Sequence, residues 1–110
     1  MDGRLPAHLE VTGMIRAVEA AGGFATILKK GEKDAGTILV VICEKGQNST
    51  LYERMPDLDG GRKWTVSKAQ DPEKPLDFSD YLDRRGRQDS DCWIVELDVA
   101  NGQQFIPGMP

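Results

Sequence analysis

The sequence predicts an α/β fold, at the border with α+β, in which one mixed β-sheet is flanked by two helices. Three observations predict it: a length of 110 residues, two amphipathic segments separated by strand patterns, and a continuous apolar run at Ile38–Cys43. This length is typical of one domain, and such a run is typical of a strand that is buried on both faces. We therefore expect a single domain over residues 1–110, with the order α-β-β-β-(β)-α-β-β.

The first element is an amphipathic helix that follows Pro6, a residue suited to a first helical turn. Its apolar positions recur at helical spacing, at Val11, Met14, Ile15 and Val18. The Gly22-Gly23 pair then ends the helix, because glycine readily takes the left-handed conformation that a helix C-terminus needs.

Strands come next along the chain. Apolar or alternating patterns predict strands over residues 24–30, 37–44 and 49–55, and a weaker alternation predicts a fourth at 62–66. Because Lys45–Asn48 has the composition of a turn, the second and third strands should form a hairpin.

The second helix is expected to start at Asp77 as its cap and to end at Gly86, after the linker Asp71–Pro75. Its apolar stripe consists of Phe78, Tyr81 and Leu82. Cys92–Asp98 is the last strong strand, and Asn101-Gly102 predicts a hairpin turn that returns Gln103–Ile106 as a further strand. Pro107–Pro110 is expected to be a loose tail.

The charge balance bears on partners and location. The chain carries 18 acidic and 14 basic residues, a net charge of -4, and the whole excess lies in residues 56–110. A field of this sign opposes broad binding to nucleic acid. No apolar stretch has transmembrane length, and the first residues lack the hydrophobic segment of a signal peptide, so we expect a cytoplasmic protein without membrane contact.

Few residues could carry catalysis. Cys43 and Cys92 lie far apart in apolar runs, and we expect two buried reduced thiols, a disulfide between neighbouring strands being the alternative. A single histidine, His8, has no nearby nucleophile, and two cysteines with one histidine do not make a zinc site. The glycines form no phosphate-binding loop. We therefore predict no catalytic residues, no metal and no cofactor.

The densest polar stretch joins the second helix to the last strand. Its candidate binding residues are Arg87, Asp89, Asp91, Trp93 and Glu96. Carboxylate oxygens at this spacing could hold a hard divalent cation, although the stretch does not match a calcium loop. Local structure is the favoured interpretation: Asp91 should accept hydrogen bonds from the backbone or Arg87, and Trp93 should anchor the core. Whether Asp89 and Asp91 bind a cation stays open.

Several stretches resemble a bacterial family catalogued as domain of unknown function 1491. They are Ala20–Ala25, Lys30–Glu32 with Ala35-Gly36, Gly61–Trp64 and Arg87–Glu96. The last resembles an Arg-x-Asp-Pro-Asp-aliphatic-Trp-x-x-Glu signature, with Ser90 in place of the proline and Cys92 in place of the aliphatic residue. The resemblance implies a small cytoplasmic α/β domain of alphaproteobacterial type, and it implies no activity.

These observations favour a non-catalytic binding or interaction domain, with a protein or small molecule as its partner. The alternative is a metal-dependent nuclease or phosphohydrolase, because the element order resembles a restriction-endonuclease-like core. Against it, Glu44-Lys45 lacks the Glu-x-Lys spacing of those enzymes. A sheet that ends in Gln103–Ile106 or in Phe24–Leu28 leaves an open edge, so we also expect a weak homodimer.

Overall fold

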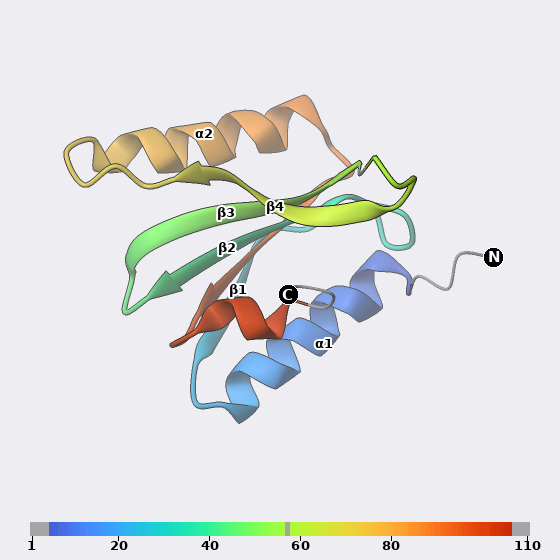
Figure 1. Cartoon of the computed structure of the whole chain (residues 1–110), viewed down its shortest axis with the longest axis horizontal. Coiled ribbons are helices and arrows are strands. Elements are labelled where there is room, and N and C mark those ends of the chain that lie inside the picture. Colours follow the sequence, from blue (N-terminus) through green and yellow to red (C-terminus); the bar gives the residue numbers. More distant parts are fainter. Residues whose placement is uncertain (1–4, 57, 107–110) are drawn as a thin grey trace.

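The computed structural model describes residues 5–56 and 58–106. Its elements are α1 (Ala7–Ala20), β1 (Phe24–Lys29), β2 (Ile38–Glu44), β3 (Gln47–Pro56), β4 (Arg62–Ala69), α2 (Pro75–Gln88), β5 (Trp93–Asp98) and the 3-10 helix η1 (Gly102–Phe105). They form one five-stranded mixed sheet between two helical layers, with α2 on one face and α1 with η1 on the other (Figure 1). The predicted fold class is confirmed. The expected loose tail, 107–110, lies outside the described residues.

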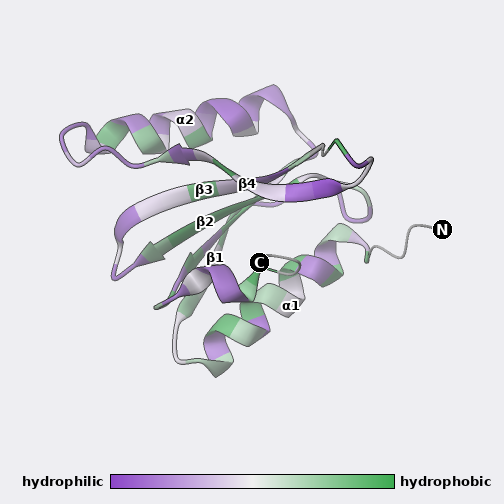
Figure 2. Ribbon diagram, in the orientation of Figure 1, coloured by the Kyte–Doolittle hydropathy of each residue, from purple (hydrophilic) through white to green (hydrophobic). Residues whose placement is uncertain are grey.

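The strand order in the sheet is β1-β5-β2-β3-β4. β5 and β2 run parallel in the centre, and the other neighbours pair antiparallel. The apolar run therefore occupies the middle strand, where both faces are covered: Ile38 to Cys43 are all buried, and β2 is hydrophobic along most of its length (Figure 2).

Two apolar clusters, one on each face of the sheet, hold the layers together. The α1 face contains Val11, Met14 and Val18 of the helix against alternate residues of β2 and β5. The α2 face contains Phe78 and Leu82 with the other set of alternate residues, such as Leu39 and Val41. This alternation places Glu96 and Asp98 on the face opposite Trp93, Val95 and Leu97, as their spacing predicts.

Glycines with positive φ are found at the end of α1 and in the β2–β3 turn. Gly22 has a φ of 86°, and the Gly23 N–H donates to the carbonyl of Val18 at 3.0 Å, which closes the helix as predicted. Lys45 and Gly46 both have positive φ, at 54° and 73°. The hairpin thus turns on two residues, and β3 begins earlier than expected, at Gln47.

The predicted final strand is wrong: Gln103–Phe105 belongs to η1, and Ile106 follows it into the core on the α1 face. The reason lies in the sheet. β5 already pairs with β1 on one side and β2 on the other, so no edge of β5 is left for a hairpin partner. Asn101 adopts φ 54°, and the chain turns under the sheet instead.

The bounds of α2 also differ from the prediction. The helix begins at Pro75 behind Lys74 rather than at Asp77, because proline fits the first helical position. It continues past Gly86 to Gln88. Gly86 does not end the helix. Its missing side chain leaves space for Lys29, because a Cβ at this position would lie 3.0 Å from Cδ of Lys29.

Candidate functional site

The predicted binding residues do not gather in one place. Trp93 is buried in the cluster on the α1 face, and its indole N–H donates to the carbonyl of Glu32 at 2.7 Å, so it anchors the core. Glu96 lies half-buried on the opposite face. The structure therefore separates both residues from the exposed side chains of Arg87, Asp89 and Asp91 at the end of α2.

The stretch between α2 and β5 forms a tight junction with the loop that follows β1. The N–H of Glu32 donates to the carbonyl of Asp91 at 2.9 Å, and Nζ of Lys29 donates to the carbonyls of Ser90 and Cys92 at 2.9 and 2.8 Å. A Cβ on Gly36 would lie 2.3 Å from the Asp91 carbonyl oxygen, so only glycine allows this approach. The backbone of this stretch therefore has a structural role.

The hydrogen bond predicted for Asp91 belongs to Asp89. The Asp89 carboxylate accepts the N–H of Asp91 at 3.0 Å, in an Asx turn that leads into β5. Within residues 5–56 and 58–106, no hydrogen bond or ion pair reaches the Asp91 carboxylate. The prediction assigned the right kind of bond to the wrong aspartate, because spacing alone does not tell which of two neighbouring carboxylates faces the backbone.

One of the two acidic side chains of β5, that of Asp98, has a structural role. Asp98 accepts the N–H groups of Lys45 and Gly46 at 2.7 and 3.0 Å and so caps the β2–β3 turn. Burial raises the pKa of Glu96, and the Asp98 charge raises it further. Among the described residues, no group of three His, Cys, Asp or Glu side chains is arranged to hold a metal ion.

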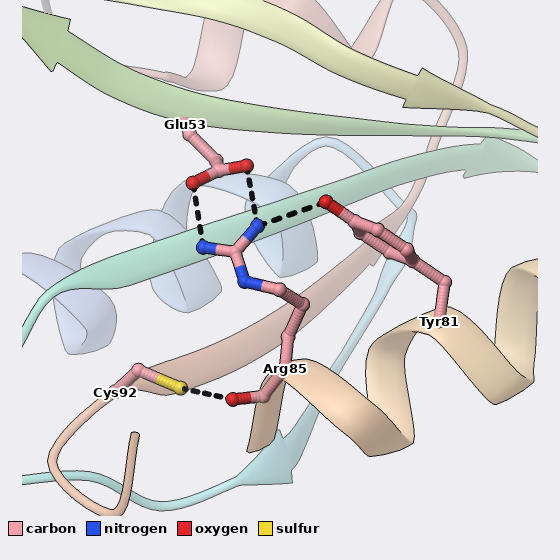
Figure 3. Close-up of polar contacts among 4 residues, drawn as sticks. All are labelled: Glu53, Tyr81, Arg85 and Cys92. Atoms are coloured by element: carbon pink, nitrogen blue, oxygen red, sulfur yellow. Dashed lines mark hydrogen bonds and ion pairs between the residues drawn. The ribbon is translucent and has the colours of Figure 1, made fainter. Parts of the chain in front are cut away.

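Both thiols are free, buried and held in their neutral form. Burial raises the pKa of Cys43 to about 11, and the charges of Glu96 and Asp98 contribute in the same direction. Burial also raises the pKa of Cys92, whose thiol donates to the carbonyl of Arg85 (Figure 3). Since the thiolate is the nucleophile, neither cysteine is activated for covalent chemistry.

An ion pair between α2 and β3 was not anticipated from the sequence. The Arg85 guanidinium makes two hydrogen bonds of 2.7 Å to the Glu53 carboxylate and a third, of 3.0 Å, to the Tyr81 hydroxyl (Figure 3). Glu53 is only 8% exposed. The charge of Arg85 is thereby neutralised within the fold, where the pair fixes α2 to the sheet.

The two edges of the sheet differ in charge. Edge strand β4 carries Arg62, Lys63 and Lys68, and Figure 2 shows long hydrophilic stretches along it. Charged side chains of this kind protect an edge against further pairing. Edge strand β1 has no charge from Phe24 to Leu28, so its outer backbone groups are accessible beside apolar side chains.

Three side chains of β1 are exposed although they are apolar. The exposed fractions are 75% for Phe24, 44% for Ile27 and 47% for Leu28. Adjacent apolar side chains on an open strand edge are unusual in a protein that acts alone. The expectation that Phe24–Leu28 leaves an edge is confirmed.

A groove runs between this edge and α2. Its cavity of about 530 Å³ has an apolar surface from Leu28, Leu82 and Ile94, with Lys29, Asp83 and Arg87 among its polar lining residues. One predicted binding residue, Arg87, therefore lines the groove. Sequence reasoning missed the rest of this set, because its members come from β1, α2 and β5 and meet only in the folded sheet.

The comparisons with known proteins give one family. The model of the family described as "Protein of unknown function (DUF1491)" matches residues 5–107. No curated protein matches the chain.

No helix among the described residues is both long and apolar enough to cross a membrane.

Solved structures agree with this assignment. A crystal structure of a DUF1491 family protein from Caulobacter crescentus has 30% identity and a TM-score of 0.80, and the match covers 94% of this chain and 96% of that one. An NMR structure of a DUF1491 family protein from the same organism has 32% identity and a TM-score of 0.77, covering 94% and 93%. A solution structure of an A. tumefaciens protein has 31% identity and a TM-score of 0.69, covering 89% and 88%.

Proposed function

This chain belongs to the DUF1491 family, a family of unknown function, and we propose that it is a non-catalytic interaction domain. It binds an extended segment of a partner chain, which adds a strand to the outer edge of β1. The observation that carries the proposal is the uncharged, exposed stretch from Phe24 to Leu28 beside the groove under α2.

Strand addition would use the unpaired backbone groups of β1 and the groove beside them. The unpaired N–H and C=O groups of β1 supply main-chain hydrogen bonds, which give affinity for any extended chain. The groove lined by Leu28, Leu82 and Ile94 accepts an apolar side chain from the added strand and so gives selectivity.

The polar groups elsewhere support a binding role over a catalytic one. Cys43 and Cys92 are protonated, the His8 ring nitrogen Nδ1 lies 3.1 Å from the carbonyl of Lys33, and Glu53 is paired with Arg85. These groups are engaged in the fold, and none is paired with an activating base.

A peptide library provides the test, because the partner is unidentified. Random peptides are selected on the wild type and then measured against Ile27→Lys, which puts a charge on the β1 edge. The matched control is Val66→Lys on β4, because Val66 is 52% exposed and Ile27 44%. Selected peptides should bind the wild type and Val66→Lys equally and lose at least tenfold in affinity for Ile27→Lys. A library without any peptide that depends on Ile27 would overturn the proposal.

The alternative, a metal-dependent nuclease or phosphohydrolase, makes a different prediction. Bound Mg²⁺ or Mn²⁺ would stabilise the folded state and raise the melting temperature in proportion to ligand concentration. An interaction domain should melt at the same temperature with either ion and with chelator. No contact among the described residues favours the alternative.

A further inference from the structure

The edge strand β1 contains a β-bulge at Leu28. Residues 24–27 pair with successive residues of β5, and the next residue of β5, Ile94, pairs with Lys29 instead of Leu28. Leu28 is therefore an extra residue in β1. A bulge of this kind leaves the extra residue outside the ladder and changes the direction of the side chains beside it.

The bulge puts two consecutive side chains on the α2 side of the sheet, although the side chains of a regular strand alternate between the faces. Leu28 lines the groove under α2, and Lys29 pairs with Ile94, which belongs to the apolar cluster on that face. Leu28 is 47% exposed, whereas Nζ of Lys29 donates to the carbonyls of Ser90 and Cys92. These two bonds hold the residue after the bulge in place, so the bulge is a fixed feature of this edge.

A bulge limits how far an added strand can follow this edge. The outward-facing backbone groups keep the spacing of a regular ladder over residues 24–27, and the bulge at Leu28 interrupts that spacing. Sheets use bulges in edge strands to prevent open-ended pairing, and the charged side chains of β4 act in the same way at the opposite edge. The stretch of β1 with regular spacing is therefore four residues long, from 24 to 27.

The groove lies at the end of this four-residue stretch. Thr26 faces the α2 side of the sheet, because it pairs with Glu96 of β5. Directly opposite residues of a strand pair share a face, so the residue of an added strand opposite Thr26 also faces α2. Because side chains alternate, the next residue of the added strand on that face lies beside Leu28, at the groove. A large apolar side chain at this position is the one that enters the groove.

From these contacts we infer that the β1 edge binds a short linear segment, which pairs with residues 24–27 and carries one large apolar anchor at the end beside Leu28. The inference rests on the proposed strand addition and names the class of its partner. Such a segment is typical of an unstructured stretch or a chain terminus that becomes ordered on binding. The edge of a second folded sheet is a poorer match, because the bulge interrupts longer pairing.

Hydrogen exchange of the backbone amides locates the pairing. The probes are library peptides whose binding to the full chain depends on Ile27. In the complex, outward-facing amides within residues 24–27 should gain roughly tenfold protection, and those of residues 28–30 should change by less than about twofold. Protection that continues to Lys30 overturns the inference and leaves the proposed function standing. A library without any Ile27-dependent peptide overturns both.

Two variants at Leu28 separate the bulge from the wall of the groove. Deletion of Leu28 removes the extra residue and keeps Lys29 next to Ile94, so it lengthens the regular edge. Leu28→Ala keeps the bulge and shortens only an exposed side chain. Peptide protection should extend to residues 29–30 in the deletion variant and stay within 24–27 in Leu28→Ala; equal patterns in the two folded variants would contradict the role of the bulge. If the deletion variant does not fold, the patterns of the wild type and Leu28→Ala decide.

The anchor is tested on the peptide itself. Serine in place of the apolar residue beside Leu28 should weaken binding to the wild type by roughly tenfold, because the groove loses its apolar occupant. Serine at the neighbouring peptide position, which faces away from α2, provides the control and should weaken binding less. Equal losses at the two positions would argue against an anchor in the groove.

Discussion

Asp89 and Asp91 are two residues apart, yet the structure gives them different roles. The Asp89 carboxylate accepts a backbone N–H, whereas the Asp91 carboxylate projects from the surface without a partner among the described residues. At the residue scale, the loop into β5 thus depends on one specific oxygen.

Alanine and asparagine substitutions should separate these roles. Asp89→Ala and Asp89→Asn both remove a negative charge from the C-terminus of α2, but only asparagine keeps the acceptor. Asp89→Ala should therefore be less stable than Asp89→Asn by about 1 kcal/mol in urea denaturation. Asp91→Ala and Asp91→Asn should agree to within about 0.5 kcal/mol. A larger loss at Asp91 than at Asp89 would contradict the hydrogen-bond assignment.

Glu96 should make the protein less stable at neutral pH. Its pKa is raised in the folded state from a reference value of 4.5, so the folded protein binds its proton more tightly than the unfolded chain does. The stability that this group contributes is present below the unfolded pKa and is lost as pH rises through the folded pKa.

Glu96→Gln stays neutral at every pH and avoids this loss. The variant should be more stable than the wild type at pH 7, and the difference should shrink towards pH 4, as measured by urea denaturation across this range. Glu19→Gln, at an exposed position of α1, provides the control and should show no such pH-dependent gain. A constant difference between Glu96→Gln and wild type at all pH values would argue against burial as the cause.

At the scale of elements, α2 is held by its apolar stripe and by one ion pair. Arg85 joins the last turns of the helix to Glu53 in β3 across 32 positions of sequence. The hydrogen bonds from Arg85 lower the pKa of Glu53 and outweigh the opposing effect of burial. The orientation of α2 over the sheet is therefore coupled to the ionisation of Glu53.

Arg85→Met should lower the free energy of unfolding by about 2 to 3 kcal/mol, because it leaves the Glu53 carboxylate buried without its partner. Arg84→Met, at the exposed neighbouring position, should change it by less than about 0.5 kcal/mol. Because the folded pKa of Glu53 is lowered, the pair stabilises above pH 4.5, and this stabilisation is lost as pH falls through the folded value. The cost of Arg85→Met should therefore shrink in acid; a cost that is independent of pH would contradict the pairing.

At the scale of the whole molecule, the sheet keeps the two thiols apart. Cys43 ends the paired region of β2 beside Asp98, and Cys92 precedes β5 at the other end of the same strand pair. Measured along the strands, Cys43 and Cys92 are about six residues apart, or roughly 20 Å, which is beyond the span of a disulfide.

The native protein should therefore react slowly with a thiol reagent, and the unfolded protein should react with two equivalents without prior reduction. Heating or denaturant should release both thiols in the same transition as the loss of circular dichroism, since both lie in the core. Detection of no free thiol after unfolding would contradict the free state of both cysteines.

Periodicity and turn chemistry predicted the local structure of α1, β2 and β5, because they report directly on burial and backbone conformation. The apolar run of β2, the stripe of α1 and the glycines that end it all take the predicted forms. Trp93 also fulfils its expected role as a core anchor, since the alternation along β5 specifies the face on which it lies.

Which segments become neighbours depends on the packing of the whole chain and could not be read from the sequence. Periodicity shows that a strand is buried but not which strand lies on each side, so Gln103–Ile106 was predicted as a strand although β1 and β2 already flank β5. The groove under α2 and the pairing of Arg85 with Glu53 have the same origin. Their residues are distant in sequence, and contacts of this kind arise from the strand order, which the packing of the whole chain selects.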